Sequence, residues 1–159
     1  MSASRDDRSA LTAARRLTLD ATAARIVNAM AEAGVRSLLL KGATLSDLYE
    51  GSRPYSDIDL LVSPDAVDGA EASLRELGFE SRHDDPHSRI WRRGGLDVDL
   101  HTTIVGVHAD PQRLWEVLSA QTEMIRVGNG SIEGLNPAAR ALSANQSAML
   151  ATAPVADPV

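Results

Sequence analysis

Residues 38–62 read LLLKGATLSDLYEGSRPYSDIDLLV, and this stretch carries most of the information about the fold. Its start completes an apolar segment, residues 35–40, that is too short for a helix and is therefore expected to be a strand. Gly42 interrupts that strand, and residues 43–49 predict a short helix. A turn-rich loop then leads to residues 57–62, which alternate as a half-buried strand does.

The Lys41-Gly42-Ala43 turn falls where the first strand ends and the short helix begins. A glycine at such a turn lets the backbone approach a ligand closely, and the exposed N–H groups of a helix start favour phosphate. The same glycine is also explained if it only allows a tight turn between strand and helix. Lys41 is a phosphate ligand on the first interpretation and a solvated side chain on the second.

Asp57 and Asp59 are two residues apart on the second expected strand, so both carboxylates point to one face while Ile58 and Leu60 enter the core. Two neighbouring carboxylates repel each other unless solvent or a divalent cation separates them. Oxygen ligands with no Cys or His nearby favour Mg²⁺ or Mn²⁺. The alternative without a metal site is that both aspartates lie on the solvated face of a half-buried sheet.

A β-hairpin is the clearest local prediction, because residues 89–93 and 96–101 flank Gly94-Gly95, a pair that suits a tight primed turn. A two-residue turn pairs Arg93 with Leu96, Arg92 with Asp97, Trp91 with Val98 and Ile90 with Asp99. Leu96, Val98 and Leu100 then share a face with Trp91.

The opposite face of that hairpin carries Asp97, Asp99 and His101. A third carboxylate beside Asp57 and Asp59 would complete a site for two metal ions of the kind that clamps both oxygens of a phosphoryl transfer. Asp99 is the first candidate for that carboxylate and Asp97 the second. His101 is expected to act as a general base or nucleotide contact, or else to be a hydrogen-bonded structural histidine.

The remaining sequence supplies helices and strands around these segments. The patterns predict helices over residues 9–33, 64–77, 110–119 and 136–150, and strands over 79–82, 122–127 and 131–133. Ser9 is the expected N-cap of the first helix and Gly34 its C-cap. The fold class is therefore α/β (α+β), with a small mixed β-sheet flanked by helices. We expect a disordered N-terminus over residues 1–8, one domain over 9–135, a C-terminal helix over 136–151 and a disordered tail over 152–159.

Composition limits the function further. The chain has 159 residues, a net charge of -6 and no cysteine, which excludes disulfides and Cys-ligated zinc. The acidic balance argues against long nucleic acid as a partner, because affinity for the phosphate backbone rests on clustered Lys and Arg. No targeting segment and no membrane-length apolar run is visible, so we expect a cytoplasmic protein that does not enter the membrane.

Taken together, these residues resemble the nucleotidyltransferase superfamily, which includes DNA polymerase beta, and most of all its bacterial group of uncharacterised members with a Lys-Gly turn. The resemblance spans about residues 20–135. It implies that Asp57, Asp59 and Asp99 are catalytic and bind the metal ions. It also implies nucleotide binding by the residues of the turn and of the following loop, namely Lys41, Gly42, Ala43, Arg53 and Ser56.

The implied reaction moves a nucleoside monophosphate from an NTP to a small-molecule or protein acceptor and releases pyrophosphate. Mg²⁺ or Mn²⁺ would be the cofactor, with ATP as the expected nucleotide, and Asp99 would help to activate the acceptor hydroxyl. A homodimer or a partner protein could complete the pocket. Two alternatives stay open: an inactive binding or regulatory module, as in a toxin–antitoxin-like pair, and a biosynthetic enzyme of another class that reuses the pocket.

Overall fold

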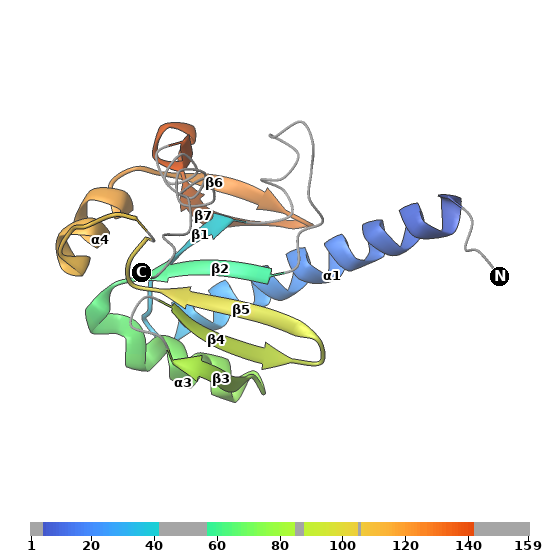
Figure 1. The fold of residues 1–159 in the computed structure, drawn as a ribbon, viewed down its shortest axis with the longest axis horizontal. Helices are drawn as coiled ribbons and strands as arrows, with labels where there is room; N and C mark the ends of the chain where they lie inside the picture. Colours follow the sequence, from blue (N-terminus) through green and yellow to red (C-terminus); the bar gives the residue numbers. More distant parts are fainter. Residues whose placement is uncertain (1–4, 42–56, 85–87, 105, 142–159) are drawn as a thin grey trace, which may run out of the picture.

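The computed structural model describes residues 5–41, 57–84, 88–104 and 106–141, and these form a seven-stranded sheet with helices on both faces (Figure 1). The strands are β1 (Ser37–Lys41), β2 (Asp57–Val62), β3 (Glu80–Asp84), β4 (Ser88–Arg93), β5 (Leu96–His101), β6 (Thr122–Val127) and β7 (Gly130–Leu135). The helices are α1 (Arg5–Glu32), the 3₁₀ helix η1 (Pro64–Ala66), α3 (Val67–Glu76) and α4 (Pro111–Ser119). The expected α/β (α+β) class with a mixed sheet flanked by helices is confirmed.

The sheet is mixed because two of its strand pairs are parallel. Its order is β3-β4-β5-β2-β1-β7-β6. β2 runs parallel to β5, and β1 runs parallel to β7, while the other neighbours are antiparallel. The strand predicted over residues 57–62 has these bounds in the structure and lies near the middle of the sheet, where both of its edges are paired.

The β4–β5 hairpin has the register that the sequence predicts. Arg93 pairs with Leu96, and the ladder continues through Arg92 with Asp97 to Ile90 with Asp99. Gly94 and Gly95 have φ angles of 54° and 81°, which are the left-handed values that a type I′ turn needs at both central positions.

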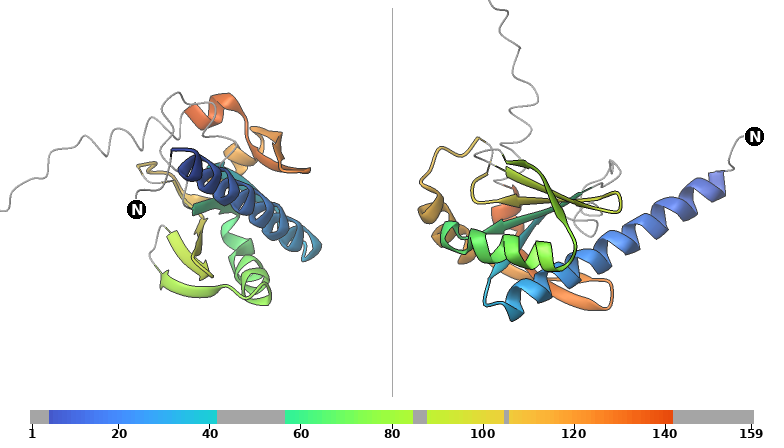
Figure 2. Two further views of the ribbon diagram at one scale, coloured as in Figure 1. Left: turned by 90° about the vertical axis from the view of Figure 1, so that its right-hand side faces the viewer. Right: turned by 90° about the horizontal axis from the view of Figure 1, so that it is seen from below.

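Helices cover both faces of the sheet (Figure 2), and each face has its own apolar cluster. On one face α1 and α3 bury the alternating residues of the central strands; this cluster includes Ile26, Leu39, Ile58, Leu60, Leu74, Trp91, Val98 and Leu100. On the other face Leu114 and Leu118 of α4, together with residues 137–141, pack over Leu38, Leu40, Leu61 and Leu135. Asp57, Asp59, Asp97, Asp99 and His101 alternate with the first cluster, so they lie on the α4 side.

Helix ends and strand lengths differ in places from the sequence-based expectation. α1 begins at Arg5 rather than after Ser9, so Ser9 is not its N-cap. Gly34 ends this helix as predicted, with a φ of 77° and a hydrogen bond from Val35 N to Met30 O that closes the last turn. β3 extends to Asp84 and β7 to Leu135, because cross-strand pairing continues to these residues.

Other expectations lie partly or wholly outside the described residues. The short helix predicted over residues 43–49 is outside them, and the last predicted helix is described only over residues 137–141. The N-terminal half of α1 extends beyond the sheet, and its Leu11 and Leu17 side chains are exposed (Figure 1). Within the described ranges, no helix is both long and apolar enough to cross a membrane.

Candidate metal centre

The parallel pairing of β2 with β5 places two carboxylates side by side. Asp59 lies directly opposite Asp99, and Leu61 lies opposite His101. Because side chains two residues apart on a strand share a face, Asp59, Asp99 and His101 all project to the α4 side of the sheet. The site is therefore built by two strands whose own positions are fixed by buried neighbours such as Ile58 and Val98.

Asp59, Asp99 and His101 form a compact group that could hold a metal ion, since each offers a ligand atom within 4.8 Å of the others. The closest contact joins His101 Nε2 to Asp59 Oδ1 at 3.0 Å. An ionised carboxylate can only accept a hydrogen bond, so Nε2 carries the hydrogen in this contact. The Asp59 and His101 side chains are 10% and 12% exposed, which shields the contact from bulk water.

Asp57 and Asp97 lie one step along the same strands, directly opposite each other. Two residues of strand span about 6.6 Å, so these carboxylates fall outside the group formed by Asp59 and Asp99. The Asp97 carboxylate accepts two hydrogen bonds from Arg92, each of 2.6 Å. This guanidinium lowers the pKa of Asp97 below its ordinary value. Asp97 thus has Arg92 as its partner. Asp57 lies next to the group formed by Asp59, Asp99 and His101.

His101, expected on the face of Asp99, also contacts Asp59. Alternation along β5 put His101 on the face of Asp99, but its contact with Asp59 depends on the parallel β2–β5 register, which local sequence does not specify. Of the two roles expected for His101, the hydrogen-bonded one is present in the structure.

The Lys41-Gly42 turn starts beside this group. Lys41 is the Cα partner of Asp59, and the β1–β2 register shifts between Leu39 and Lys41, as it does at a β-bulge. Such irregularities are common next to active sites because they redirect the chain. The other residues proposed to bind nucleotide, Gly42, Ala43, Arg53 and Ser56, lie outside the described residues, as does the side chain of Lys41.

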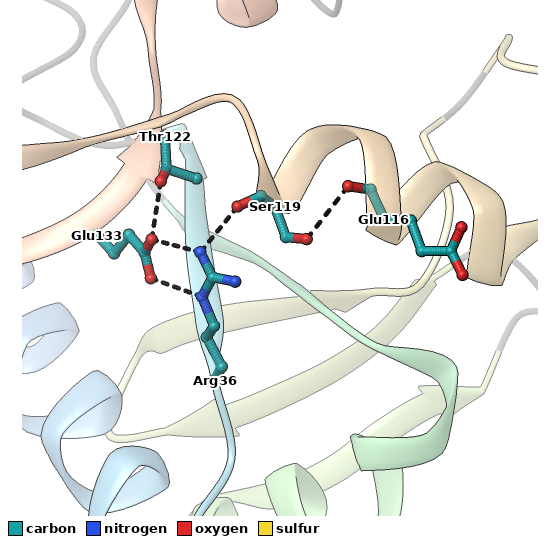
Figure 3. A network of polar contacts seen from close by, with 5 residues as sticks. All are labelled: Arg36, Glu116, Ser119, Thr122 and Glu133. Atoms are coloured by element: carbon teal, nitrogen blue, oxygen red, sulfur yellow. Dashed lines mark hydrogen bonds and ion pairs between the residues drawn. The ribbon is translucent and has the colours of Figure 1, made fainter.

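A polar network at the opposite end of β1 ties α4 to the sheet (Figure 3). Arg36 donates to both carboxylate oxygens of Glu133, at 2.9 and 2.6 Å, and to the carbonyl of Ser119 at 2.8 Å. Thr122 donates to the same carboxylate at 2.8 Å. The hydrogen bond from Arg36 lowers the pKa of Glu133. Because Ser119 is the last residue of α4, this network fixes the helix that covers the metal-centre face.

The fold and the paired carboxylates define a nucleotidyltransferase-type domain, and solved structures agree. The antibiotic-resistance factor ANT(2'')-Ia is 16% identical, with a TM-score of 0.64 over 91% of this chain and 78% of that one. The lincosamide antibiotic adenylyltransferase LnuA, solved with lincomycin bound, is 17% identical, with a TM-score of 0.51 over 74% of this chain and 80% of that one. At these identities the likeness establishes the fold.

The chain belongs to the uncharacterised nucleotidyltransferase family NTP_transf_5, whose model matches residues 4–144. A comparison with curated proteins finds no sequence match. Membership of this family places the chain among the transferases, as the resemblance to nucleotidyltransferases implied.

Proposed function

We propose that this protein is a metal-dependent nucleotidyltransferase that moves a nucleoside monophosphate from an NTP, with ATP as the favoured donor, to a small-molecule acceptor. The observation that carries the proposal is the group formed by Asp59, Asp99 and His101. Two opposed carboxylates on the middle strands of a sheet are costly unless a cation lies between them. Family membership supports the same reaction class.

The oxygen ligands favour Mg²⁺ or Mn²⁺, and in the proposed site Asp57, Asp59 and Asp99 hold these ions. The ions would supply positive charge to the triphosphate and the leaving pyrophosphate. His101 would act on Asp59 by holding its carboxylate in one orientation, as partners of metal ligands commonly do. The start of the Lys41-Gly42 turn beside Asp59 would bring backbone N–H groups toward the phosphates.

In the proposed reaction the acceptor hydroxyl oxygen bonds to the α-phosphorus of the NTP while the bond from that phosphorus to the bridging oxygen breaks. The hydroxyl proton passes to Asp99 or to water, and pyrophosphate leaves with the electron pair. Catalysis would rest on positioning and charge neutralisation. The Asp59 carboxylate is nearly buried, which would strengthen its interaction with a cation.

A small molecule is the proposed acceptor for two reasons. The two structural neighbours are named as an antibiotic-resistance factor and an antibiotic adenylyltransferase. The net charge of -6 also opposes binding to long nucleic acid. Acceptor screening would also reveal a protein acceptor. It would likewise reveal whether a second copy of the chain or a partner protein completes the pocket.

The decisive experiment measures nucleotide binding and turnover separately. The full chain is incubated with Mg²⁺ or Mn²⁺ and each labelled NTP, with and without a panel of small hydroxylated acceptors, and pyrophosphate release is followed. We expect metal-dependent binding of ATP, and its loss in Asp59→Asn and Asp99→Asn. Asp97→Asn is the matched carboxylate variant, and it should lose far less of the metal-dependent ATP binding because Asp97 is held by Arg92.

The outcomes separate the alternatives. Binding that needs metal and both Asp59 and Asp99, but gives no pyrophosphate with any acceptor, would favour a regulatory module over an enzyme. A protein that binds no NTP in the presence of either metal would contradict the proposal.

A further inference from the structure

A cavity lies on the sheet face away from the metal centre. It has a volume of about 300 Å³ and lies between α1, the end of α3 and the turn of the β4–β5 hairpin, segments that can be followed in Figure 2. Its apolar lining comes from Ile26, Leu77, Phe79 and Leu96. Ile26 and Phe79 are buried in the cluster under α1 and α3, so the base of the cavity is part of the rigid core.

Two arginines, Arg25 on α1 and Arg93 at the end of β4, line this cavity, and none of its described lining residues is acidic. Thr22 also lines it, but its hydroxyl donates to the carbonyl of Thr18 at 2.7 Å. The charged donors available to a ligand are therefore the two guanidinium groups. The Arg93 side chain lies beside the turn that ends α3, since its Nε is 3.7 Å from the point where a Cβ on Gly78 would be.

Lack of a carboxylate partner distinguishes Arg25 and Arg93 from seven other arginines of the described ranges. Elsewhere in the described part of the chain, ion pairs with Asp or Glu engage Arg36, Arg75, Arg82, Arg89, Arg92, Arg113 and Arg140. Arg25 and Arg93 have no such pair with a described residue. In a chain with a net charge of -6, two unpaired guanidinium groups at one cavity concentrate positive charge there.

The cavity is separate from the metal centre. Leu96 lines it and lies on the same face of β5 as Val98 and Leu100, which are buried under α1 and α3. Asp99 and His101 alternate with these residues and project to the other face. A ligand of the cavity would therefore not touch the carboxylates.

From these observations we propose that the cavity between α1, α3 and the β4–β5 turn binds a small organic anion, with a phosphate or carboxylate head and an apolar body. The planar guanidinium forks of Arg25 and Arg93 suit such oxyanions, which accept paired hydrogen bonds. The apolar body would lie on Leu77 and Leu96, the partly buried apolar residues of the lining. The volume is at the lower end of the range for small-molecule sites, so the ligand has about the size of one substituted ring.

The test uses phenyl phosphate as the probe and the full chain in EDTA, so that the metal centre cannot bind the phosphate through a cation. Backbone amide shifts are followed by NMR during titration. We expect saturable shifts at Gly94 and Leu96, and none at Asp99 or His101. Inorganic phosphate should bind about tenfold more weakly because it lacks the ring. Benzyl alcohol and benzylamine, which lack the anionic head, should give no saturable shift.

Variants then identify the donors. Arg25→Gln and Arg93→Gln should each weaken the binding of phenyl phosphate about tenfold, which is the effect of losing a charge-assisted hydrogen bond. Arg126→Gln is the matched control, because Arg126 lies on β6 and does not line the cavity. The amide spectrum of each variant reports directly whether it is folded. The proposal would be overturned by unsaturable shifts, by equal binding of benzylamine, or by unchanged affinity in both cavity variants.

Discussion

Asp59 and Asp99 are direct partners across the parallel strands β2 and β5, and His101 Nε2 lies 3.0 Å from Asp59 Oδ1. This relationship joins residues 40 or more positions apart in the sequence, and it exists only because β5 joins the sheet beside β2. A cation between the carboxylates would relieve their repulsion, so metal should stabilise the folded chain.

The first prediction concerns metal-linked stability. At a free metal concentration ten times the dissociation constant, Mn²⁺ or Mg²⁺ should raise the free energy of unfolding by about 1.4 kcal/mol. Urea titrations with and without EDTA measure this difference. The gain should vanish in Asp59→Asn and in Asp99→Asn, while Asp97→Asn should keep it. An equal gain in all four proteins would mean that the ions bind elsewhere.

The second prediction concerns His101. If the hydrogen bond of His101 orients Asp59, then His101→Ala should weaken the binding of Mg²⁺ and of Mn²⁺ by a similar factor, about tenfold or more. Losing the hydrogen-bond partner of a metal ligand commonly has an effect of this size. Isothermal titration calorimetry with each ion gives the two factors. A loss confined to Mn²⁺ would instead identify the imidazole as a direct ligand, since nitrogen ligands favour that ion over Mg²⁺.

The third prediction follows from the pKa of Glu133, which the hydrogen bond from Arg36 lowers below the ordinary value of 4.5. As pH falls below that value, the unfolded chain takes up this proton before the folded chain does, so the stabilisation present at neutral pH is progressively lost. Because Arg36 is 49% exposed, we expect Glu133→Gln to cost only about 0.5–1 kcal/mol at pH 7.

Urea titrations of the wild type and Glu133→Gln between pH 7 and pH 3 check this third prediction. The stability difference between the two proteins should shrink toward acid pH and should also shrink in high salt. A difference that stays constant over the whole range would show that the carboxylate charge does not contribute.

The fourth prediction concerns Gly134 on β7. A Cβ there would lie 2.2 Å from Ile125 Cδ1 and 3.0 Å from the carbonyl oxygen of Leu39. Gly134→Ala should therefore destabilise the chain by about 1–3 kcal/mol through overpacking. Gly130→Ala on the same strand is the matched control, because its nearest contact would be an ordinary 3.9 Å. Equal melting temperatures for the two variants would contradict this reading of β7.

Local patterns in the sequence predicted much of the fold. The register of the β4–β5 hairpin was predicted from Gly94-Gly95 and the alternation around this pair. The bounds of β2 were predicted from the alternation over residues 57–62, and those of α4 from its Asp110-Pro111 start. Asp110 caps α4 through a hydrogen bond from the Arg113 amide, a signal that is readable in sequence. These features depend on neighbours in the chain.

Strand order and long-range contacts were not predicted, because they depend on how distant segments pack. Nothing near Leu39 indicates that it pairs with Gly134, and nothing near Arg36 indicates Glu133 as its partner. The same holds for the contact of His101 with Asp59. Placing Asp59 and Asp99 on the polar faces of two strands was possible from alternation, whereas their direct opposition required the parallel β2–β5 pairing.

The length of the hairpin around Gly94-Gly95 decides which face of the sheet carries the metal centre. Side chains on β5 point alternately to the two faces, so an insertion or deletion of one residue between this turn and Asp99 reverses the parity of the strand. Asp99 and His101 would then face α1 and α3, and Val98 and Leu100 would face the acidic side. Changes in length of this hairpin therefore preserve the metal centre when they come in steps of two, or when a β-bulge absorbs the extra residue.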